Sequence, residues 1–479
     1  MSLFDRAPFI VIWETTRACA LSCVHCRAEA ISRRDPGELT TEEGKRLLDR
    51  VAAFGDPAPI LVLTGGDPLR RPDITELVSH GTARGISMSL TPSGTAAVTE
   101  PRLRALRDAG LARLAVSLDG ATAEAHDAFR RVRGSHRYTM RIIEHARALS
   151  LPLQINTTVC TQTLRDLPAL ARQMEEYGVV LWALFFLIPV GRAVADQGLP
   201  AEEIERVLEW AADLATRAPF GVKTTEAPHY HRVLAQRGQS SRPASIGADA
   251  APGRPVAAAP GLIGRAGRAV TDGNGFVFVD HVGRICPSGF LPMPAGNVRT
   301  DDLVAVYREH PLFTSLRDPA RLGGRCGRCE YRDGCGGSRA RAWAASKDPL
   351  AEDPGCAHVP GRARPGSACA ATAAPVIAGG SDARPEVTGE QVTQALRTVF
   401  DPELGMSIVE LGLVYGIAID NGAVRITMTL TTPGCPIQHV MLQWVREALM
   451  PVPGVEQVEV AITFDPPWTP ERIMLPSSR

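Results

Sequence analysis

Short apolar runs alternate with amphipathic stretches from residue 9 to about residue 218, and this alternation limits the folds open to the chain. Each run has the length and the apolar content of a β-strand, and a helix-like segment follows each one. Strands that are apolar on both faces predict a parallel sheet covered by helices. The six runs span residues 9–16, 59–66, 86–94, 113–120, 152–159 and 180–191.

Six βα units fit either an incomplete (β/α) barrel or a doubly wound sheet, and in both folds the functional loops lie at the C-terminal ends of the strands. The residues alone leave both α/β folds open for the domain over residues 1–235.

The rest of the chain divides by composition. Residues 236–262 are rich in Ala, Pro, Gly and Ser without any period, which predicts a flexible insertion. A small cysteine-rich domain is expected over 263–360, and residues 361–385 have the composition of a linker. Residues 386–479 predict a separate α+β domain, with a helix, a hairpin whose strands are joined by Asn-Gly, and a second helix.

Charge and hydropathy exclude several classes of protein. Lys plus Arg equals Asp plus Glu at 52 each, so no overall field favours nucleic acid as a partner. No uncharged apolar stretch reaches 18 residues, and the N-terminus lacks the layout of a signal peptide, so we expect no membrane partner and a cytoplasmic location. The eleven cysteines then stay reduced, which favours metal ligation or catalysis over disulfides.

Cys19, Cys23 and Cys26 follow the first predicted strand. Three thiolates can hold a cubic cluster of four irons and leave one iron without a protein ligand, where a substrate or cofactor can bind. The structural alternative is a zinc site completed by His25 or a distant ligand.

Polar and glycine residues gather at the ends of the next strands. A glycine-rich turn follows the second strand and exposes backbone groups to a ligand, although the same residues are common in ordinary turns. Later strand ends carry polar residues that serve as helix caps in many folds. These candidates are Gly65, Gly66, Asp67 and Pro68, then Ser93, Ser117, Asp119 and Asn156.

The cysteine spacing and this turn together resemble the radical S-adenosylmethionine (SAM) enzymes, in which a GGEP-like motif follows the second strand and Asp67 here replaces the glutamate. The resemblance implies a partial (β/α)6 TIM-like barrel over residues 1–235 and a [4Fe-4S] cluster on the three cysteines. It further implies SAM on the open iron and on the turn, with the later strand ends at the SAM carboxylate and ribose. It also implies a reductant such as ferredoxin or flavodoxin, and reductive cleavage of SAM to a 5′-deoxyadenosyl radical that abstracts hydrogen from a substrate.

A second group of cysteines comprises Cys326, Cys329, Cys335 and Cys356, which can fill a closed set around zinc or an iron-sulfur cluster. The segment resembles the SPASM extension of radical SAM enzymes, but Arg339 stands where that pattern has a cysteine. The resemblance implies one auxiliary [4Fe-4S] cluster, with Cys286 as a spare thiol. That single-cluster arrangement resembles the subgroup that acts on haem-like tetrapyrroles as much as it resembles peptide modifiers, so both substrate classes stay open.

Between the barrel and the cysteine-rich domain, residues 222–233 gather Lys223, Glu226, His229, Tyr230 and His231. These side chains could bind substrate carboxylates or relay a proton, and the alternative is a polar loop between two domains. Glu226, His229 and Tyr230 are the catalytic candidates.

The C-terminal domain resembles a family of metal-sulfur cluster assembly factors, on Asp401-Pro402-Glu403 and on Cys435-Pro436. The resemblance implies a part in iron-sulfur delivery, with Cys435 as a metal ligand. Cys160 is expected to be an ordinary buried thiol and Cys369 a linker thiol. An iron-sulfur scaffold or carrier with an idle barrel is the alternative function.

Overall fold

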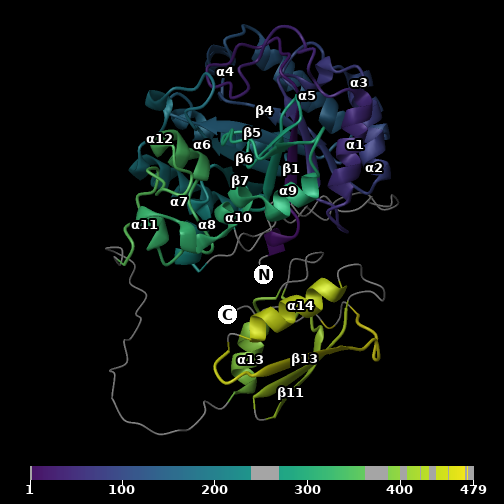
Figure 1. Cartoon of the computed structure of the whole chain (residues 1–479), viewed down its shortest axis with the longest axis vertical. Helices are drawn as coiled ribbons and strands as arrows, with labels where there is room; N and C mark the ends of the chain where they lie inside the picture. Colours follow the sequence, from purple (N-terminus) through teal and green to yellow (C-terminus); the bar gives the residue numbers. More distant parts are fainter. Residues whose placement is uncertain are drawn as a thin grey trace. The chain divides into compact units, whose positions relative to one another are not determined.

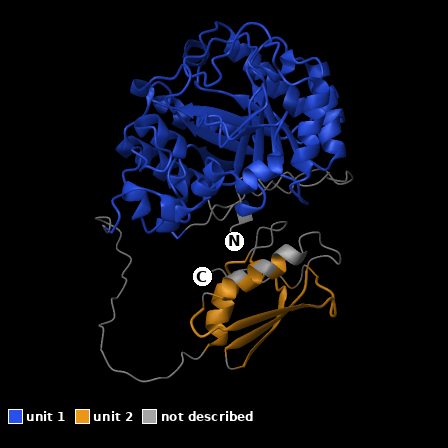
Figure 2. Ribbon diagram, viewed as in Figure 1, with its two compact units in different colours: residues 1–363 blue, residues 364–479 orange. Residues whose placement is uncertain are grey.

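The computed structural model describes residues 3–238, 269–361, 387–399, 407–420, 422–430, 438–450, 452–469 and 472. The chain forms two compact units, residues 1–363 and 364–479 (Figure 2). The predicted insertion and the predicted linker lie almost entirely outside the described residues.

A ten-stranded sheet forms the centre of the first unit, in the order β10-β9-β8-β1-β2-β3-β4-β5-β6-β7. Strands β1 to β7 are parallel, and each pairs with the next one in sequence. A doubly wound sheet would reverse its strand order, so this consecutive order is that of a partial barrel. The strands are β1 (Ile10–Thr16), β2 (Ile60–Gly65), β3 (Met88–Leu90), β4 (Arg113–Ser117), β5 (Leu153–Val159), β6 (Leu181–Phe186) and β7 (Gly221–Thr225).

Helices follow the strands and lie around the sheet (Figure 1). They are α1 (Thr41–Ala52), α2 (Ile74–Ala83), α3 (Glu100–Asp108), α4 (Ala123–Arg130), α5 (Ser135–Ala148), α6 (Leu167–Tyr177), α7 (Ala201–Arg217) and α8 (His229–Gln236).

Helix α1 shows how particular residues determine where a helix begins and how closely it packs. Thr40 Oγ1 accepts a hydrogen bond from the Glu43 backbone N–H at 3.2 Å, and Glu43 Oε2 accepts one from the Thr40 N–H at 2.8 Å. This capping box contributes about 1 kcal/mol. The buried stripe includes Gly44, whose missing side chain lets the helix lie against Trp13, because an added Cβ would be 2.6 Å from the indole ring.

Five strands differ from the sequence prediction or were not part of it. Strand β6 ends at Phe186 because Pro189, which has no backbone N–H, follows soon after. Strand β7 was not expected, since its residues are polar and half-buried. Strand β8 (Phe276–Val279) pairs in parallel with β1 on the side opposite β2, and β9 (Arg284–Cys286) and β10 (Gly296–Asn297) extend that edge antiparallel.

The cysteine-rich segment packs onto this sheet through four helices. Tyr307 in α9 joins two parts of the unit, because its hydroxyl donates to the Phe4 carbonyl at 2.6 Å and accepts from the Gly275 N–H at 3.2 Å. The helices are α9 (Leu303–Glu309), α10 (Pro311–Arg317), α11 (Gly324–Gly327) and α12 (Arg339–Ser346).

The second unit is α+β and has its own apolar core. The predicted hairpin is present, and a third strand, which was not predicted, pairs in parallel with the second. The elements are α13 (Gly389–Leu396), β11 (Val414–Asp420), β12 (Ala423–Met428), α14 (Gln438–Leu449) and β13 (Gln457–Ile462). Cys369, Cys435 and the Asp401–Glu403 segment lie outside the described residues. Among the helices that the structure describes, none is long and apolar enough to cross a membrane.

Candidate active site and auxiliary cysteine site

Cys19, Cys23 and Cys26 lie in the loop after β1 and line a cavity of about 290 Å³ inside the barrel. The loop is fixed by backbone contacts, such as that between the Cys19 N–H and the Ile31 carbonyl at 2.8 Å. None of the nine cysteines in the described part of the chain forms a disulfide.

Two of these sulfurs receive hydrogen bonds. The Leu21 N–H donates to Cys19 Sγ at 3.3 Å, and Ser93 Oγ lies 3.2 Å from the same sulfur. Arg130 Nη1 donates to Cys23 Sγ at 3.6 Å. Burial raises the pKa of the Cys19 thiol, which these donors oppose by stabilising the thiolate. Donors of this kind tune the reduction potential of an iron-sulfur cluster.

The spacing of the three sulfurs fits a cluster better than a single zinc ion. Four ligands at about 2.3 Å around zinc lie about 4 Å apart. In the described residues, no three ligand atoms of the first cysteine site lie within 4.8 Å of one another. The His25 ring stacks on Phe129 with centroids 4.4 Å apart, and burial, together with the charge of Arg130, lowers its pKa to about 4. His25 therefore packs as a neutral ring beside the cysteines.

The glycine-rich turn lies directly against the cysteine loop. The Gly66 N–H donates to the Thr16 carbonyl and the Asp67 N–H to the Ala18 carbonyl, both at 2.7 Å. Gly65 has φ +137°, and a Cβ on it would be 2.2 Å from the Thr16 oxygen. A Cβ on Gly66 would be 2.5 Å from two carbonyl oxygens. Only glycine permits this approach.

Gly65 and Gly66 line the cavity, whereas Asp67 and Pro68 do not. Asp67 is buried, and its carboxylate accepts from the Leu69 N–H at 3.2 Å and from Thr95 Oγ1 at 3.3 Å. Burial raises its pKa. The structure thus places Asp67 behind the turn, as its support.

The candidate residues at the later strand ends also divide into those that line the cavity and one that does not. Ser93, Ser117 and Asn156 line the cavity. Asp119 does not, because it is buried in an ion pair with Arg130 and accepts from the Thr158 N–H at 2.7 Å. Burial opposes its ionisation, but the charge of Arg130 keeps the pKa of Asp119 below its usual value.

Basic and aromatic residues in the cavity wall escaped the sequence analysis. Arg27 is paired with Glu14 at 2.7 Å and lies over the Phe278 ring. Arg192 has buried Nε and Nη2 atoms without a hydrogen-bond partner among the described residues. Its position after β6 is the signal that could have identified it. The further residues of this kind in the wall are Arg113, Arg130, Phe185, Phe186, Phe276 and Phe290, and the wall also includes Lys223, which the sequence analysis named.

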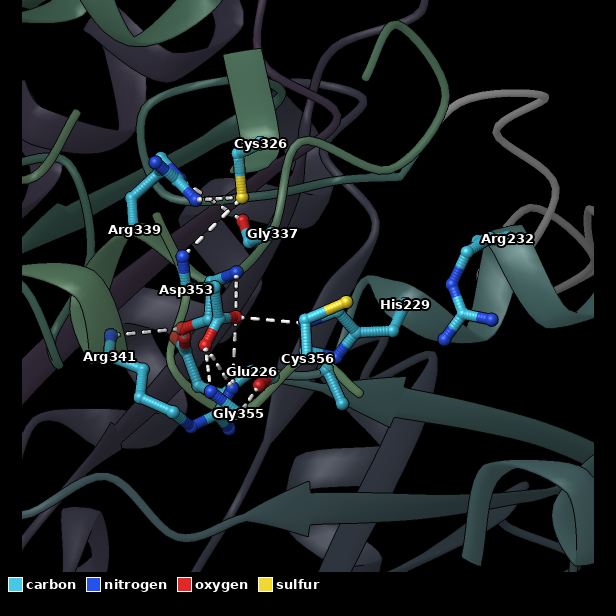
Figure 3. A network of polar contacts seen from close by, with 12 residues as sticks. Glu226, His229, Arg232, Cys326, Gly337, Arg339, Arg341, Asp353, Gly355 and Cys356 are labelled. Carbon is cyan, nitrogen blue, oxygen red and sulfur yellow. Dashed lines mark hydrogen bonds and ion pairs between the residues drawn. The ribbon is translucent and has the colours of Figure 1, made fainter. Parts of the chain in front are cut away.

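The four cysteines of the second group line a small cavity together with His229 and Arg232. Figure 3 shows Cys326 and Cys356 of this group with His229 and Arg232. Cys326 Sγ accepts from the Asp353 N–H at 3.4 Å. Burial raises the pKa of the Cys356 thiol to about 11. In the described residues, Cys329 Sγ lies within 4.8 Å of ligand atoms of Glu330 and His358, a group that could hold a single metal ion, and the other three sulfurs belong to no such group.

Arg339, which stands where a cysteine was expected, is buried beside this site. Its Nη2 donates to Cys326 Sγ at 3.6 Å and its Nη1 to the Ala351 carbonyl at 2.8 Å. Cys286 lies in β9 and lines neither cysteine cavity, and burial raises its pKa to about 12. Cys160 is buried, as expected.

Glu226 and His229 connect the barrel to the auxiliary site (Figure 3). Glu226 Oε2 accepts from Ser338 Oγ at 2.6 Å, and its backbone carbonyl accepts from Arg341 at 2.6 Å. His229 Nε2 lies 3.0 Å from Asp353 Oδ2. Burial opposes the ionisation of Asp353, but Arg341 and His229 keep its pKa far below the usual range.

Glu226 and Tyr230 line a second cavity, of about 120 Å³, with His231. Burial and the neighbouring Asp272 raise the pKa of Glu226 well above its usual value, and burial raises that of Tyr230 to about 12. Lys223 lines both cavities, so the two adjoin along β7.

Known proteins resemble the chain in two separate parts. Residues 13–174 match the model of the radical SAM superfamily, and residues 389–461 match that of an iron-sulfur cluster assembly protein. The AdoMet-dependent heme synthase of Methanosarcina barkeri (strain Fusaro / DSM 804) is 39% identical over 76% of this chain and 100% of its own length. Mycofactocin maturase MftC of Mycobacterium tuberculosis (strain CDC 1551 / Oshkosh) is 31% identical over 74% of this chain and 84% of its own.

Among solved structures, Streptococcus suis SuiB bound to S-adenosylmethionine covers 74% of this chain and 78% of its own, with a TM-score of 0.56 at 16% identity, which supports the fold. These matches identify an enzyme that uses a [4Fe-4S] cluster and SAM. The chain therefore belongs to the radical SAM superfamily, in the family that includes AdoMet-dependent heme synthase, and it carries an iron-sulfur cluster assembly domain after the enzyme.

Proposed function

We propose that this enzyme uses the cleavage of SAM to oxidise a carboxylate-bearing side chain of a tetrapyrrole. The observation that carries the proposal is the lining of the barrel cavity, in which phenylalanine rings and basic side chains lie beside the cysteine loop. Aromatic walls suit a flat macrocycle, and basic side chains suit its carboxylates. The relative with 39% identity is named for making haem with AdoMet.

In this proposal the three cysteines after β1 hold the SAM-binding cluster, which when bound supplies the electron that cleaves SAM into methionine and a hydrogen-abstracting 5′-deoxyadenosyl radical. Gly65, Gly66 and the cavity-lining Ser93, Ser117 and Asn156 contact SAM. Asp67 and Asp119 hold these groups in place from behind, because their carboxylates accept hydrogen bonds from protein atoms, and Pro68 follows Asp67 outside the cavity lining.

The auxiliary cysteines explain how the substrate radical is resolved. Loss of one hydrogen atom next to a carboxymethyl group leaves a carbon radical, which can expel CO₂ and one electron to give a C=C bond. That electron needs an acceptor. We assign this part to one [4Fe-4S] cluster on Cys326, Cys329, Cys335 and Cys356. The Glu226–Ser338 and His229–Asp353 contacts support this assignment, because they join the segment that carries these cysteines to the barrel.

The remaining partners follow from the same proposal. A ferredoxin or flavodoxin supplies the first electron, and the cytoplasm is the expected location because the thiols must stay reduced. The C-terminal domain delivers iron and sulfide to the enzyme, with Cys435 as its ligand.

Anaerobic reconstitution tests the proposal. Full-length protein is loaded with iron and sulfide and mixed with SAM, dithionite and iron-coproporphyrin III. We expect 5′-deoxyadenosine together with a tetrapyrrole that has lost CO₂ and two hydrogens, measured by mass spectrometry. Cys23→Ala should abolish both products, and Cys160→Ala, which alters a buried thiol outside both sites, should retain them.

Two other outcomes would contradict the proposal. 5′-Deoxyadenosine with an unchanged tetrapyrrole would refute this substrate and favour a peptide. Intact clusters without 5′-deoxyadenosine would favour an iron-sulfur scaffold or carrier.

A further inference from the structure

The barrel cavity reaches from the cysteine loop to the first residues of the strands. Its lining includes Gly65 and Ser117 at the C-terminal strand ends, and also Ile10 and Arg113, which begin β1 and β4. Arg113 and Ser117 are about 13 Å apart along the strand. TIM barrels usually fill this volume with side chains, so an open inner end is a departure that needs a reason.

Two basic side chains meet at this inner end. Lys223, on β7, and Arg113, on β4, are close enough for the charge of Arg113 to act on the lysine. Burial and that charge lower the pKa of Lys223 to about 8, and burial lowers that of Arg113 to about 10. Both cations thus lie where water solvates them poorly.

Lys223 differs from the other lysines of the chain, of which there are only two. Lys45 pairs with Glu42 at 3.0 Å and Glu76 at 2.7 Å, and Lys347 lies over the Trp343 ring. Lys223 Nζ makes no hydrogen bond or ion pair with any residue in the described ranges, although it borders both cavities. Lys223 is half-buried in the cavity wall, where a cation without a counterion is poorly stabilised, so a bound anion would stabilise this arrangement.

From this geometry we infer that Lys223 and Arg113 form a carboxylate-binding subsite at the inner end of the barrel cavity, which holds one acidic side chain of the substrate away from the reacting carbon. The SAM carboxylate is the competing anion. SAM must lie at the cysteine loop, where Arg130 contacts Cys23, whereas Arg113 begins its strand at the other end. The phenyl ring of Phe276 lines the cavity beside Lys223, so the subsite would accept an apolar stem that ends in a carboxylate.

This inference rests on the proposed function for the identity of the substrate, but the subsite can be tested without a tetrapyrrole. In the reconstituted full-length protein, a pulse of acetic anhydride at pH 8 labels lysines that are neutral, which includes about half of Lys223 at a pKa of about 8. Lys45 and Lys347 serve as internal references in the peptide mass spectrum.

We expect 3-phenylpropionate to protect Lys223 and its uncharged amide, 3-phenylpropanamide, not to protect it. Equal protection by both compounds, or by neither, would overturn the subsite.

The second part of the test measures the binding of iron-coproporphyrin III to variants of Lys223. Lys223→Met keeps the length of the side chain and removes its charge, and it should weaken binding of iron-coproporphyrin III about 10- to 100-fold, the value of one hydrogen bond to a charged group. Lys223→Arg should restore most of the affinity. The affinity for SAM should not change in either variant.

Loss of SAM affinity in Lys223→Met, or unchanged tetrapyrrole affinity, would overturn the subsite. If wild-type protein binds no tetrapyrrole while 3-phenylpropionate still protects Lys223, the proposed substrate is refuted and the subsite stands.

Discussion

Arg130 connects two buried groups, since its guanidinium pairs with Asp119 and donates to Cys23 Sγ. The pairing holds the pKa of Arg130 above its usual value, although burial opposes this. Removing one partner of a buried ion pair leaves the other charge without compensation.

We therefore expect Arg130→Met to lower the free energy of unfolding by about 3–5 kcal/mol, measured by urea denaturation, because Asp119 keeps a buried charge. The double variant Arg130→Met/Asp119→Leu should recover part of the loss. Arg104→Met, which breaks an exposed pair with Glu100, is the control and should cost less than about 1 kcal/mol. A similar loss in Arg130→Met and Arg104→Met would contradict this account.

Buried histidines predict how stability depends on pH. Burial lowers the pKa of His25, His126 and His231 to about 4 each. In the unfolded chain these rings titrate near 6.5, so the unfolded state takes up protons first as the pH falls. Each histidine should leave stability unchanged above about pH 6.5 and reduce it between about pH 6.5 and pH 4.

His231→Phe tests this dependence, because burial is the sole cause of its shift and its ring lines the smaller cavity. The slope of unfolding free energy against pH near pH 5 should fall by about 1 kcal/mol per pH unit relative to the wild type. His310→Phe, at the start of the α10 helix, is the comparison variant. An unchanged slope in His231→Phe would show that the ring is already protonated in the folded state.

At the scale of elements, the turn after β2 controls the shape of the SAM site. A methyl group on Gly66 would lie 2.5 Å from two carbonyl oxygens of the cysteine loop, and backbone atoms cannot yield as a flexible side chain can. Gly66→Ala should therefore separate the turn from the loop and lower both iron content and SAM affinity by about tenfold or more.

Gly389→Ala is the matched control, because this glycine begins α13 and a Cβ on it meets no atom within 4 Å. Iron analysis and SAM binding by equilibrium dialysis measure the two effects. Normal SAM affinity in Gly66→Ala would show that the close contact between turn and loop is not needed.

The sequence predicted the strands that are apolar on both faces. Strands β1, β2 and β5 follow apolar runs closely, because burial on both faces requires apolar residues throughout. Strand β7 was not predicted, because one of its faces borders the cavity and carries the polar residues Lys223 and Thr225. Its polar residues have the composition of a loop.

The residues of the candidate site also divide into those that the sequence predicted and those that it did not. Spacing along the chain predicted the cysteines and the glycine turn, because neighbouring ligands must lie on one loop. Lys223 was named as a possible contact for substrate carboxylates, but Arg113 was not predicted, because an arginine at the start of a strand can face either water or a cavity. The roles of Asp67 and Asp119 as supports also depend on side-chain direction, which only the structure gives.

At the scale of the whole molecule, each unit has its own apolar core, so the C-terminal domain can be removed without opening the core of the enzyme. We expect a chain without residues 386–479 to cleave SAM normally after chemical reconstitution but to contain less iron per chain when purified from cells. Iron and sulfide assays on anaerobically purified protein measure this difference.

Cys435→Ala in the full-length chain separates delivery from a general effect of truncation, and it should reproduce the low iron content. Equal iron in the full-length, truncated and Cys435→Ala proteins would rule out delivery by this domain.

The hydrogen bonds between the turn after β2 and the loop after β1 are all between protein atoms, at Thr16–Gly66 and Ala18–Asp67. The cysteine loop is thus tied to the turn after β2 by the protein's own backbone groups, whereas small metal domains take their order from the ion. A substitution that shifts this turn should therefore shift the cysteines as well.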